Sequence, residues 1–515
     1  MPNHAELPGA DESYWMHSTD ATRFAPLTDD LTGDRTVDLA VIGGGVAGLS
    51  TAWEAARTGR SVVVLEADRI AAGVSGYTTA KVTAQHTLIY DRLRRKQGAE
   101  AARLYAASHT DAMERIAAVA AELDLPCDLE IRPAITYSRD PAARSELRAE
   151  ARAARDAGLN AEYVEETELP FTVAGAVRVA DQAQFHPRAY LLGLATDLAA
   201  RGATVYERTR VTALSEGEPC RLRTESGATV AARDVVVATH YPVFDRAMLF
   251  TRLSPRRELV VAAPIDAGAD PHGMYITEGD GKRSVRTAPL PDGRRLLIVT
   301  GEEFTPGTGG VAERFRVLDA WMREYFPVAE TAYHWAAQDN DPSDKVAMVG
   351  PLHPAARHAY VAAGFGGWGM TGGAMAGRLL SELIAGRAPE WAGLYDPRRL
   401  WSVLKEAPTL LKQQAEVAQH FIGDRLRTTH VDDLSGIGPG TGAIVRIGGR
   451  RCAVYRDEDG TAHAVSARCT HLGCLVAFND AERTWDCPCH GSRFGVDGAV
   501  VHGPAVRPLE PRTVE

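Results

Sequence analysis

The chain has 515 residues, of which 45% are apolar and 24% charged, a composition typical of globular proteins and a length that suggests about three domains. Its formal net charge of −10 argues against binding to nucleic acid or to an anionic membrane surface, because both partners require a basic face. No run approaches the roughly 18 apolar residues of a spanning helix, and the first residues lack the pattern of a signal peptide. We therefore expect a cytoplasmic protein without a membrane span.

Residues 1–34 are polar and rich in proline, aspartate and threonine, and they predict an N-terminal extension that Trp15 attaches to the domain surface. From Asp38 the pattern changes to a short apolar run, a glycine turn, an alanine-rich helical stretch and a second apolar run. This order is typical of a β-α-β unit in a parallel sheet. Residues 89–157 have helical spacing and predict helices that cover a sheet. The region 35–398 is thus expected to be α/β.

Three glycines follow the first apolar run at the spacing G-x-G-x-x-G: Gly43, Gly45 and Gly48. In a dinucleotide-binding turn the first permits a tight turn, the second lets the pyrophosphate approach the backbone, and the third lets helix and strand pack closely. Glu66 ends the second apolar run about 20 residues on, where an acid accepts hydrogen bonds from the adenosine ribose. A glycine turn without a ligand is the alternative, but the flanking strands and the acid favour nucleotide binding.

Two features favour FAD over NAD. A small, hydroxyl-rich stretch that can run along a buried flavin follows Glu66 and includes Ser75, Thr78 and Thr79. A second glycine turn near residue 364 leads into a helical stretch, whose positive end can stabilise the negative charge of a reduced flavin. The cofactor-binding residues predicted from this turn are Gly366, Gly369 and Met370.

Residues 36–390 resemble the D-amino-acid oxidase/glycine oxidase class of FAD-dependent oxidoreductases. The matching segments are VIGGGVAGLSTAWEAARTG, the Ser75-Gly76 pair, Asp344 in DPSDKVAMVG, and GFGGWGMT. The resemblance implies a Rossmann-type FAD-binding domain interleaved with a sheet-based substrate domain. The expected FAD-binding segments are about 35–95, 185–245 and 335–398, and the expected substrate-domain segments are about 96–184 and 246–334.

Two side chains of this region are open to two interpretations, and a third is given no role. His240, in VVVATHYP, stands where such enzymes usually have glycine, and we assign it no flavin role. Trp368 and Met370 either pack in the core or line the substrate face of the flavin. Only one glycine motif lies in a β-α-β frame, so no separate NAD(P)H domain is expected.

The resemblance, and not the spacing, implies that the substrate is an amine or an amino acid. An arginine commonly pairs with a substrate carboxylate because its planar fork forms two parallel hydrogen bonds. Arg286 is our candidate, with Arg256 and Arg257 behind it, and a solvated surface charge is the alternative for each. No catalytic base is predicted, because hydride transfer to a flavin mainly requires orientation and an unprotonated amine.

The pattern changes again near residue 398. Residues 399–428 predict an amphipathic helical linker, and residues 429–515 predict an all-β domain. Five of the seven cysteines lie between Cys452 and Cys489. A cluster at one end of a chain indicates a metal site rather than a disulfide scaffold.

Cys469 and His471 form C-x-H, and Cys487 and His490 form C-x-x-H. Two sulfurs and two imidazoles can hold either a tetrahedral zinc ion or an iron–sulfur cluster. The extra pair, Cys474 and Cys489, separates the two interpretations, because with it the loops CTHLGC and CPCHGSRF closely resemble Rieske proteins of the respiratory-complex type. The resemblance implies that the extra pair forms a disulfide, that the two other cysteines ligate one iron of a [2Fe–2S] cluster, and that the two histidines ligate the other. Histidine ligation raises the reduction potential of the cluster into the range of about −150 to +300 mV.

The same resemblance gives Ser492 the role of a hydroxyl donor to a bridging sulfide. Phe494 stands where high-potential members carry tyrosine, so we expect a potential below the top of that range. The segment GPAVRPL resembles the proline loop that covers the cluster. The remaining cysteines, Cys127, Cys220 and Cys452, are interpreted as buried thiols.

Together these sites predict an FAD-dependent dehydrogenase that oxidises an amine or amino acid C–N bond. Electrons would pass singly through the cluster, whose histidine edge we expect to be exposed, to an external acceptor such as a ferredoxin-like protein, an oxygenase or the quinone pool. The alternative is a module that relays electrons between proteins without a small-molecule substrate of its own. No two-histidine, one-carboxylate iron site is apparent, so oxygenation within this chain is not expected.

Overall fold

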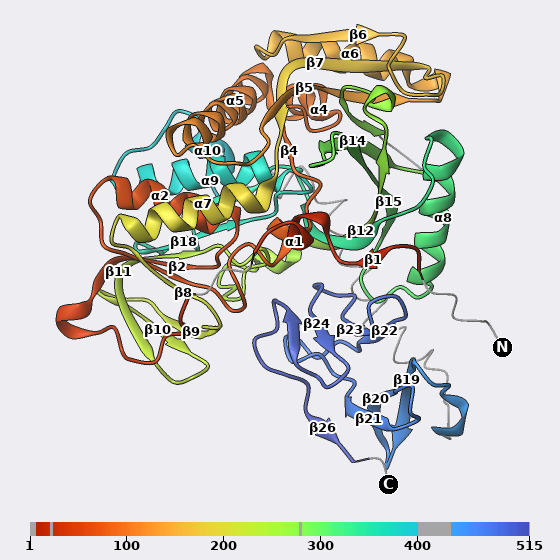
Figure 1. Ribbon diagram of the computed structural model, residues 1–515. Coiled ribbons are helices and arrows are strands. Elements are labelled where there is room, and N and C mark those ends of the chain that lie inside the picture. Colours follow the sequence, from red (N-terminus) through yellow and green to blue (C-terminus); the bar gives the residue numbers. More distant parts are fainter. Residues whose placement is uncertain (1–6, 21–23, 278–280, 400–433, 514–515) are drawn as a thin grey trace.

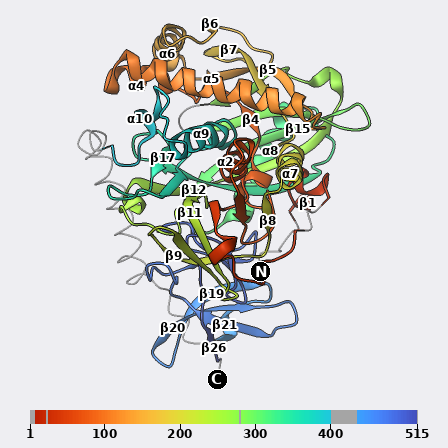
Figure 2. The ribbon, with the colours of Figure 1, turned by 90° about the vertical axis from the view of Figure 1, so that its left-hand side faces the viewer.

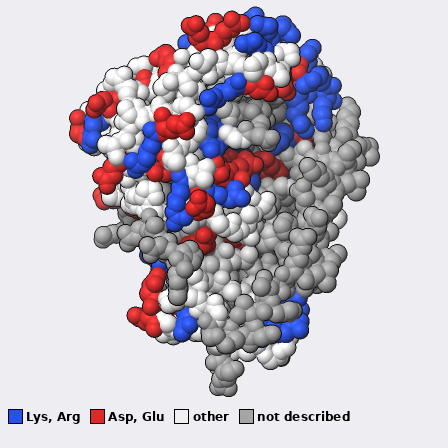
Figure 3. All heavy atoms as spheres, turned by 90° about the vertical axis from the view of Figure 1, so that its right-hand side faces the viewer, with Lys and Arg blue, Asp and Glu red and all other residues white. Residues whose placement is uncertain are grey.

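The computed structural model describes residues 7–20, 24–277, 281–399 and 434–513. Residues 7–399 form an α/β part, and residues 434–513 form a C-terminal domain of strands. Figures 1 and 2 show the C-terminal domain at the end of the molecule opposite α6 (Arg144–Asp156). No helix within the described ranges has the length and apolar character needed to cross a bilayer. On the face shown in Figure 3, acidic and basic side chains are interspersed.

The first β-α-β unit lies in an eight-stranded sheet in the order β17-β18-β11-β2-β3-β8, with β10 joined to β11 and β9 to β10. The pairs that flank β2 and β3 are parallel, as the continuous apolar runs predict, because such strands are buried on both faces. The strands are β2 (Val37–Ile42), β3 (Val62–Leu65), β8 (Thr204–Tyr206), β9 (Val211–Ser215), β10 (Cys220–Thr224), β11 (Thr229–Val237), β17 (Met348–Pro351) and β18 (Ala359–Ala363).

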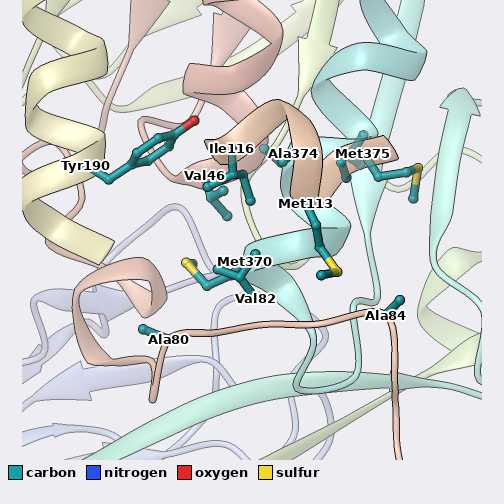
Figure 4. Packing of buried hydrophobic residues seen from close by; sticks show 14 of the residues in the cluster. Val46, Ala80, Val82, Ala84, Met113, Ile116, Tyr190, Met370, Ala374 and Met375 are labelled. Carbon is teal, nitrogen blue, oxygen red and sulfur yellow. The ribbon is translucent and has the colours of Figure 1, made fainter. Parts of the chain in front are cut away.

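Helices α2 (Val46–Arg57), α7 (Pro187–Ala200) and α9 (Gly369–Ile384) pack beside this sheet. The α2 and α9 backbones lie close together because α9 carries glycine where they meet. A Cβ at Gly377 would lie 2.4 Å from the Cβ of Ser50, and a Cβ at Gly373 would lie 2.6 Å from Val46. Figure 4 shows Met370 and Ala374 of α9 beside Val46 of α2.

A ten-stranded sheet forms the second half of the α/β part, in the order β1-β16-β12-β15-β14-β13-β5-β7-β4, with β6 paired to β7. Helix α8 (Val311–Tyr325) covers one face of it, where its apolar side chains join the core of β12 and β15. The strands are β1 (Ala10–Asp11), β4 (Lys81–Val82), β5 (Glu130–Ser138), β6 (Ala161–Val164), β7 (Gly175–Gln184), β12 (Leu253–Ile265), β13 (Met274–Thr277), β14 (Arg283–Pro289), β15 (Arg295–Phe304) and β16 (Tyr333–Pro342).

Helices α4 (Ile89–Gln97) and α5 (Ala99–Glu122) lie with α6 on the far side of this sheet, and α10 (Ala392–Tyr395) contacts α5. The two sheets alternate along the chain, so the α/β part is interleaved. The strand β16 lies wholly in the ten-stranded sheet, although the expected boundary at 335 gives most of it to the FAD-binding segments. The reason is its pairing with β12 in an antiparallel ladder from Ala262↔Tyr333 to Leu253↔Pro342.

The N-terminal segment is built into the fold. Trp15, in α1 (Tyr14–His17), is 1% exposed and its Nε1 donates a hydrogen bond to the Thr78 carbonyl at 2.7 Å. The strand β1 extends the ten-stranded sheet as a parallel neighbour of β16. Trp15 therefore anchors this segment to the domain, with the indole inserted into the core and not resting on the surface.

The C-terminal domain consists of two antiparallel four-stranded sheets, in the orders β19-β20-β21-β26 and β22-β23-β24-β25. Apart from Arg399, the expected helical linker 399–428 lies outside the described residues. The strands are β19 (Thr441–Ile447), β20 (Arg450–Arg456), β21 (Ala462–Ser466), β22 (Ala477–Asn479), β23 (Thr484–Asp486), β24 (Arg493–Gly495), β25 (Val500–His502) and β26 (Pro511–Arg512).

Candidate functional site

The turn between β2 and α2 requires glycine at two of the three motif positions. Gly43 has φ +111°, and a Cβ there would lie 2.3 Å from the Ala238 carbonyl oxygen. A Cβ at Gly48 would lie 1.9 Å from the Gly43 carbonyl oxygen. Gly45 has more room, with the Ser75 Oγ at 3.1 Å from the position of a Cβ. The motif therefore builds a close helix–strand contact and leaves an open space in front of α2.

Glu66 lies at the end of β3, beside this turn. Its Oε2 accepts a hydrogen bond from the Gly44 amide at 2.7 Å, and its Oε1 accepts one from the Asp68 amide at 2.8 Å. Burial raises the pKa of the Glu66 carboxyl, and the two amide bonds oppose that rise. The side chain is thus held in one orientation at the wall of the cavity described next.

Two cavities meet in the α/β part. The dinucleotide cavity, of about 240 Å³, lies over the β2–α2 turn, and the polar cavity, of about 540 Å³, lies between the start of α9 and the ten-stranded sheet. Thr78, Phe365, Gly367 and Met370 line both. The dinucleotide cavity is also lined by the predicted residues Gly43, Gly45, Glu66, Ser75 and Gly369, and the polar cavity by Thr79 and Gly366; Gly48 lines neither.

These residues fit FAD. The glycines leave room that side chains would fill, and the amide of Val46 at the α2 N-terminus already bonds to Ser75 Oγ at 3.1 Å. At the second turn Gly366 and Gly367 have φ of +59° and +90°, so the chain can turn sharply into α9. Two helix N-termini therefore border adjacent cavities that share lining residues, an arrangement suited to a ligand that carries phosphate at one end and a charged ring at the other.

Trp368 and Met370, for which the sequence leaves two interpretations, both line the polar cavity. The indole of Trp368 stacks on the imidazole of His86, with ring centroids 4.5 Å apart and planes 20° apart. His86 in turn contacts the Tyr105 hydroxyl at 2.5 Å and the Thr83 carbonyl at 2.9 Å. This wall is therefore aromatic and fixed by hydrogen bonds behind it.

The arginine candidates occupy three different environments. Arg286 is 1% exposed, is absent from the cavity wall, and donates hydrogen bonds to the carbonyls of Thr79 and Ala80 at 2.9 and 2.7 Å. Burial lowers the pKa of its guanidinium to about 9. Arg256 lines the polar cavity but is paired with Asp341 at 2.8 Å. The structure therefore does not place Arg286 where it could hold a substrate.

The predicted cluster residues come together in two loops of the C-terminal domain. Cys469 and His471 precede β22, and Cys487 and His490 lie between β23 and β24. The rings of His471 and His490 are 4.9 Å apart at 89°. A hydrogen bond with the Cys487 thiol lowers the pKa of Cys469 to about 7. Both histidine Nδ1 atoms are buried and lack a hydrogen-bond partner among the described residues, so these donors fit a [2Fe–2S] cluster.

The second pair of cysteines joins the same two loops. Cys474 and Cys489 form a disulfide, which leaves Cys469 and Cys487 as free thiols. Ser492 is fully buried; its Oγ accepts a hydrogen bond from the Ala505 amide at 3.0 Å and bonds to Cys469. The domain core around these loops contains Phe494, and the cysteines outside the loops, Cys127, Cys220 and Cys452, are buried free thiols.

The cluster histidines face the α/β part. The Tyr241 ring lies 5.9 Å from that of His490 and 6.4 Å from that of His471, and the Phe250 ring lies 5.6 Å from His490. His490 is 4% exposed. The expectation of an exposed histidine edge is therefore wrong for His490, whose ring is covered by aromatic rings from another part of the chain, whereas His471 stays partly exposed.

Polar contacts hold this interface. Gln338 Nε2 donates a hydrogen bond to the Gly491 carbonyl, next to His490, at 2.9 Å. Arg257, which is 1% exposed, pairs with Glu482 and lies 3.5 Å from Asp486. Arg256 and Arg257 are neighbours on β12 and therefore point to opposite faces of the sheet. The third arginine candidate thus binds the C-terminal domain.

The C-terminal domain also contributes to the wall of the dinucleotide cavity. His502, Gly503 and Ala505 line it together with the β2–α2 turn. The ring of His240, which lines the same cavity, lies 5.2 Å from that of His502. His240 is followed by Tyr241, the residue that packs on the cluster histidines. No local pattern in the sequence indicates this contact, since His240 and His502 are distant in the chain.

Comparisons with known proteins agree with these sites. Residues 38–383 match the FAD dependent oxidoreductase (DAO) family, and residues 426–512 match the Rieske [2Fe-2S] domain. A protein of Bacillus subtilis (strain 168), YhfW, named as a Rieske 2Fe-2S iron-sulfur protein, is 33% identical over 512 residues, with 99% of each chain covered. The cytochrome b6-f complex iron-sulfur subunit of Pisum sativum is 52% identical over 52 residues, which cover 10% of this chain and 23% of that protein.

Solved structures share the fold of the α/β part. Glycine oxidase from Geobacillus kaustophilus has a TM-score of 0.57 at 20% identity and covers 69% of this chain and 96% of its own. L-Proline dehydrogenase from P. horikoshii has a TM-score of 0.59 at 18% identity and covers 73% and 99%. With its FAD and [2Fe–2S] sites, the chain belongs to the DAO family of FAD-dependent oxidoreductases and carries a C-terminal Rieske domain.

Proposed function

We propose that this protein is a dehydrogenase that oxidises the C–N bond of an amine or amino acid and passes the electrons one at a time, through its Rieske domain, to an external acceptor. One observation carries the proposal: the Rieske domain lines the dinucleotide cavity, and Tyr241 packs on both predicted histidine ligands of the cluster. Two redox sites that share a wall can exchange electrons without a separate docking step.

FAD, when bound, supplies two-electron oxidation of the substrate, and a [2Fe–2S] cluster supplies one-electron delivery. The residues of the chain bind the cofactors and orient the substrate. The polar cavity shares Thr78 and Met370 with the dinucleotide cavity, so a substrate in it would lie next to a flavin there. Trp368, held against His86, forms the aromatic part of the wall that positions the substrate.

The substrate class is supported by the names of the structural neighbours. They are a glycine oxidase, an L-proline dehydrogenase and L-amino acid deaminases, and each acts on a C–N bond beside a carboxylate. For the acceptor we propose a ferredoxin-like protein, an oxygenase or the quinone pool. We place the protein in the cytoplasm.

The test is anaerobic addition of glycine, sarcosine, D-amino acids and small amines to the purified holoprotein. The flavin absorbance should bleach with at least one of them, and a rhombic paramagnetic signal of the reduced cluster should follow in the same sample. If only a reduced partner protein bleaches the flavin, the chain is a protein-to-protein relay instead. If the flavin bleaches and the cluster stays oxidised, the internal transfer is excluded.

A further inference from the structure

The polar cavity has many charged side chains in its wall, and most cations there are neutralised. Arg256 pairs with Asp341 at 2.8 Å and Arg283 with Glu302 at 2.6 Å. The two lysines at the rim behave in the same way: Lys282 pairs with Glu258 at 2.6 Å, and Lys345 pairs with Asp341 at 2.8 Å. These groups satisfy one another and leave little net charge for a ligand.

Lys81 is different. It lies on β4, three residues after Thr78, and its side chain lines the polar cavity. Its Nζ donates to the Ser284 Oγ at 2.5 Å and to the Thr79 Oγ1 at 3.2 Å. Both partners are neutral hydroxyls, and among the described residues no carboxylate lies within ion-pair distance of Nζ. An ammonium has three donors, so one remains for a ligand.

The charges around Lys81 favour an anion. Burial, together with the nearby cations of Arg286 and Lys282, lowers the pKa of its ammonium to about 7, although the carboxylate of Glu258 opposes this shift. A partly buried cation without a counter-ion is costly, and an anion that pairs with it removes that cost. Such a ligand would also restore the proton that burial tends to remove.

We propose that Lys81 is the anion-binding residue of the polar cavity and that the substrate presents a carboxylate to it. This inference rests on the proposed function, because it takes the polar cavity as the substrate site. It assigns to Lys81 the role that the sequence suggested for Arg286. The substrate is accordingly an amino acid, and an amine without an acidic group is excluded as the preferred substrate.

The first experiment titrates the oxidised holoprotein with benzoate and with benzamide, its neutral isostere, and follows the shift of the flavin absorbance. Benzoate should bind at least tenfold more tightly than benzamide. Its Kd should rise about tenfold between pH 6 and pH 8, because the amine loses its proton near pH 7 and only the ammonium pairs with the acid. Equal affinity for the two probes overturns the proposal without any variant.

The second experiment uses matched lysine variants. K81M should weaken benzoate binding at least tenfold and remove its pH dependence, whereas K81R should bind benzoate equally at pH 6 and pH 8. K345M removes the same charge from the same cavity, but at a lysine with a carboxylate partner, and should change the Kd less than twofold. A K81M protein that binds benzoate like the unmodified protein contradicts the proposal, and so does an equal loss in K345M.

These outcomes are independent of turnover. If no amino acid or amine bleaches the flavin, the proposed function fails, but benzoate binding still reports whether Lys81 holds an acid. FAD content and the thermal midpoint of each variant show whether it folds. If K81M does not retain FAD, the comparison of benzoate with benzamide on the unmodified protein decides the question alone.

Discussion

Gly48 shows how strongly one residue can control cofactor binding. Its position faces the Gly43 carbonyl oxygen, which a Cβ would approach to 1.9 Å, so Gly48→Ala must separate α2 from β2. We expect a loss of about 1–3 kcal/mol of stability and a clear fall in the molar ratio of FAD to protein, measured by absorbance after gel filtration. Gly393→Ala is the control, because nothing lies within 4 Å of the added methyl group. Full FAD occupancy in Gly48→Ala would contradict the prediction that FAD binding requires glycine at this position.

Ser492 offers a second test at this scale. Its buried hydroxyl bonds to Cys469, and hydrogen bonds to cluster sulfurs stabilise the reduced state. Ser492→Ala should therefore lower the midpoint potential of the cluster in a redox titration followed by paramagnetic resonance. Thr441→Val, in the same domain, removes a hydroxyl that bonds only to the Gly438 carbonyl among the described residues and should leave the potential unchanged. An unchanged potential in Ser492→Ala would rule out this hydrogen bond as a determinant.

The sequence alone cannot show whether Lys81 or Arg286 binds the substrate carboxylate. Both are cations in polar segments, and the difference between them is made by partners elsewhere in the chain. The carbonyls of Thr79 and Ala80, more than 200 residues away, occupy the guanidinium of Arg286. The spacing of cysteines and histidines, in contrast, brings all four predicted cluster ligands together because each pair lies in one short loop.

Among the elements, α8 depends on the C-terminal domain for its first turn. The Asp480 Oδ1 accepts a hydrogen bond from the Val311 amide at 2.9 Å, as a helix cap does, although it belongs to the loop after β22. Asp480→Ala should cost about 1 kcal/mol and loosen the interface between the domains. The measurement is the rate at which the cluster signal appears after anaerobic reduction of the flavin, which should fall.

Asp140→Ala is the matched control for this cap. The Asp140 carboxylate accepts from the Ala142 amide at 2.9 Å within the α/β part. Its loss should lower stability by a similar amount and leave the appearance of the cluster signal unchanged. Equal effects of the two substitutions would show that Asp480 stabilises only its own helix.

Elements are predictable where the pattern is local. The β-α-β unit follows from two apolar runs and a glycine turn, and β2, α2 and β3 have the expected order. The expected boundary at 335 divides β16, because the partner of this strand, β12, begins 80 residues earlier and the pairing is a tertiary contact that no local pattern indicates. Tyr241 and Phe250, which pack on His490, are likewise not predicted, because they belong to no motif and the contact is tertiary.

On the scale of the molecule, a buried ionic network joins the two parts. Arg257 and Arg493 both pair with Glu482, and although burial opposes ionisation, they lower the pKa of this carboxyl to about 2. Removal of Arg257 leaves Arg493 as the one cation that pairs with Glu482 and Asp486 among the described residues, so we expect a loss below the about 3–5 kcal/mol of a fully uncompensated buried charge. Arg257→Leu should therefore lower the thermal midpoint and sharply slow reduction of the cluster.

Arg115→Leu separates these two effects. Arg115 pairs with Glu54 at 2.6 Å, and both residues belong to the α/β part. Its loss should reduce stability but not the rate of cluster reduction by the flavin. If Arg257→Leu lowers stability alone, the network supports folding and has no part in communication between the sites.

The packing of His490 against the α/β part has a kinetic consequence. Because the Rieske domain and the cavity that it lines belong to one chain, the meeting of the two redox sites is intramolecular. Transfer between them should be first-order, with a half-time that does not change when the enzyme is diluted a hundredfold. Only the later encounter with the outside acceptor should depend on concentration and ionic strength.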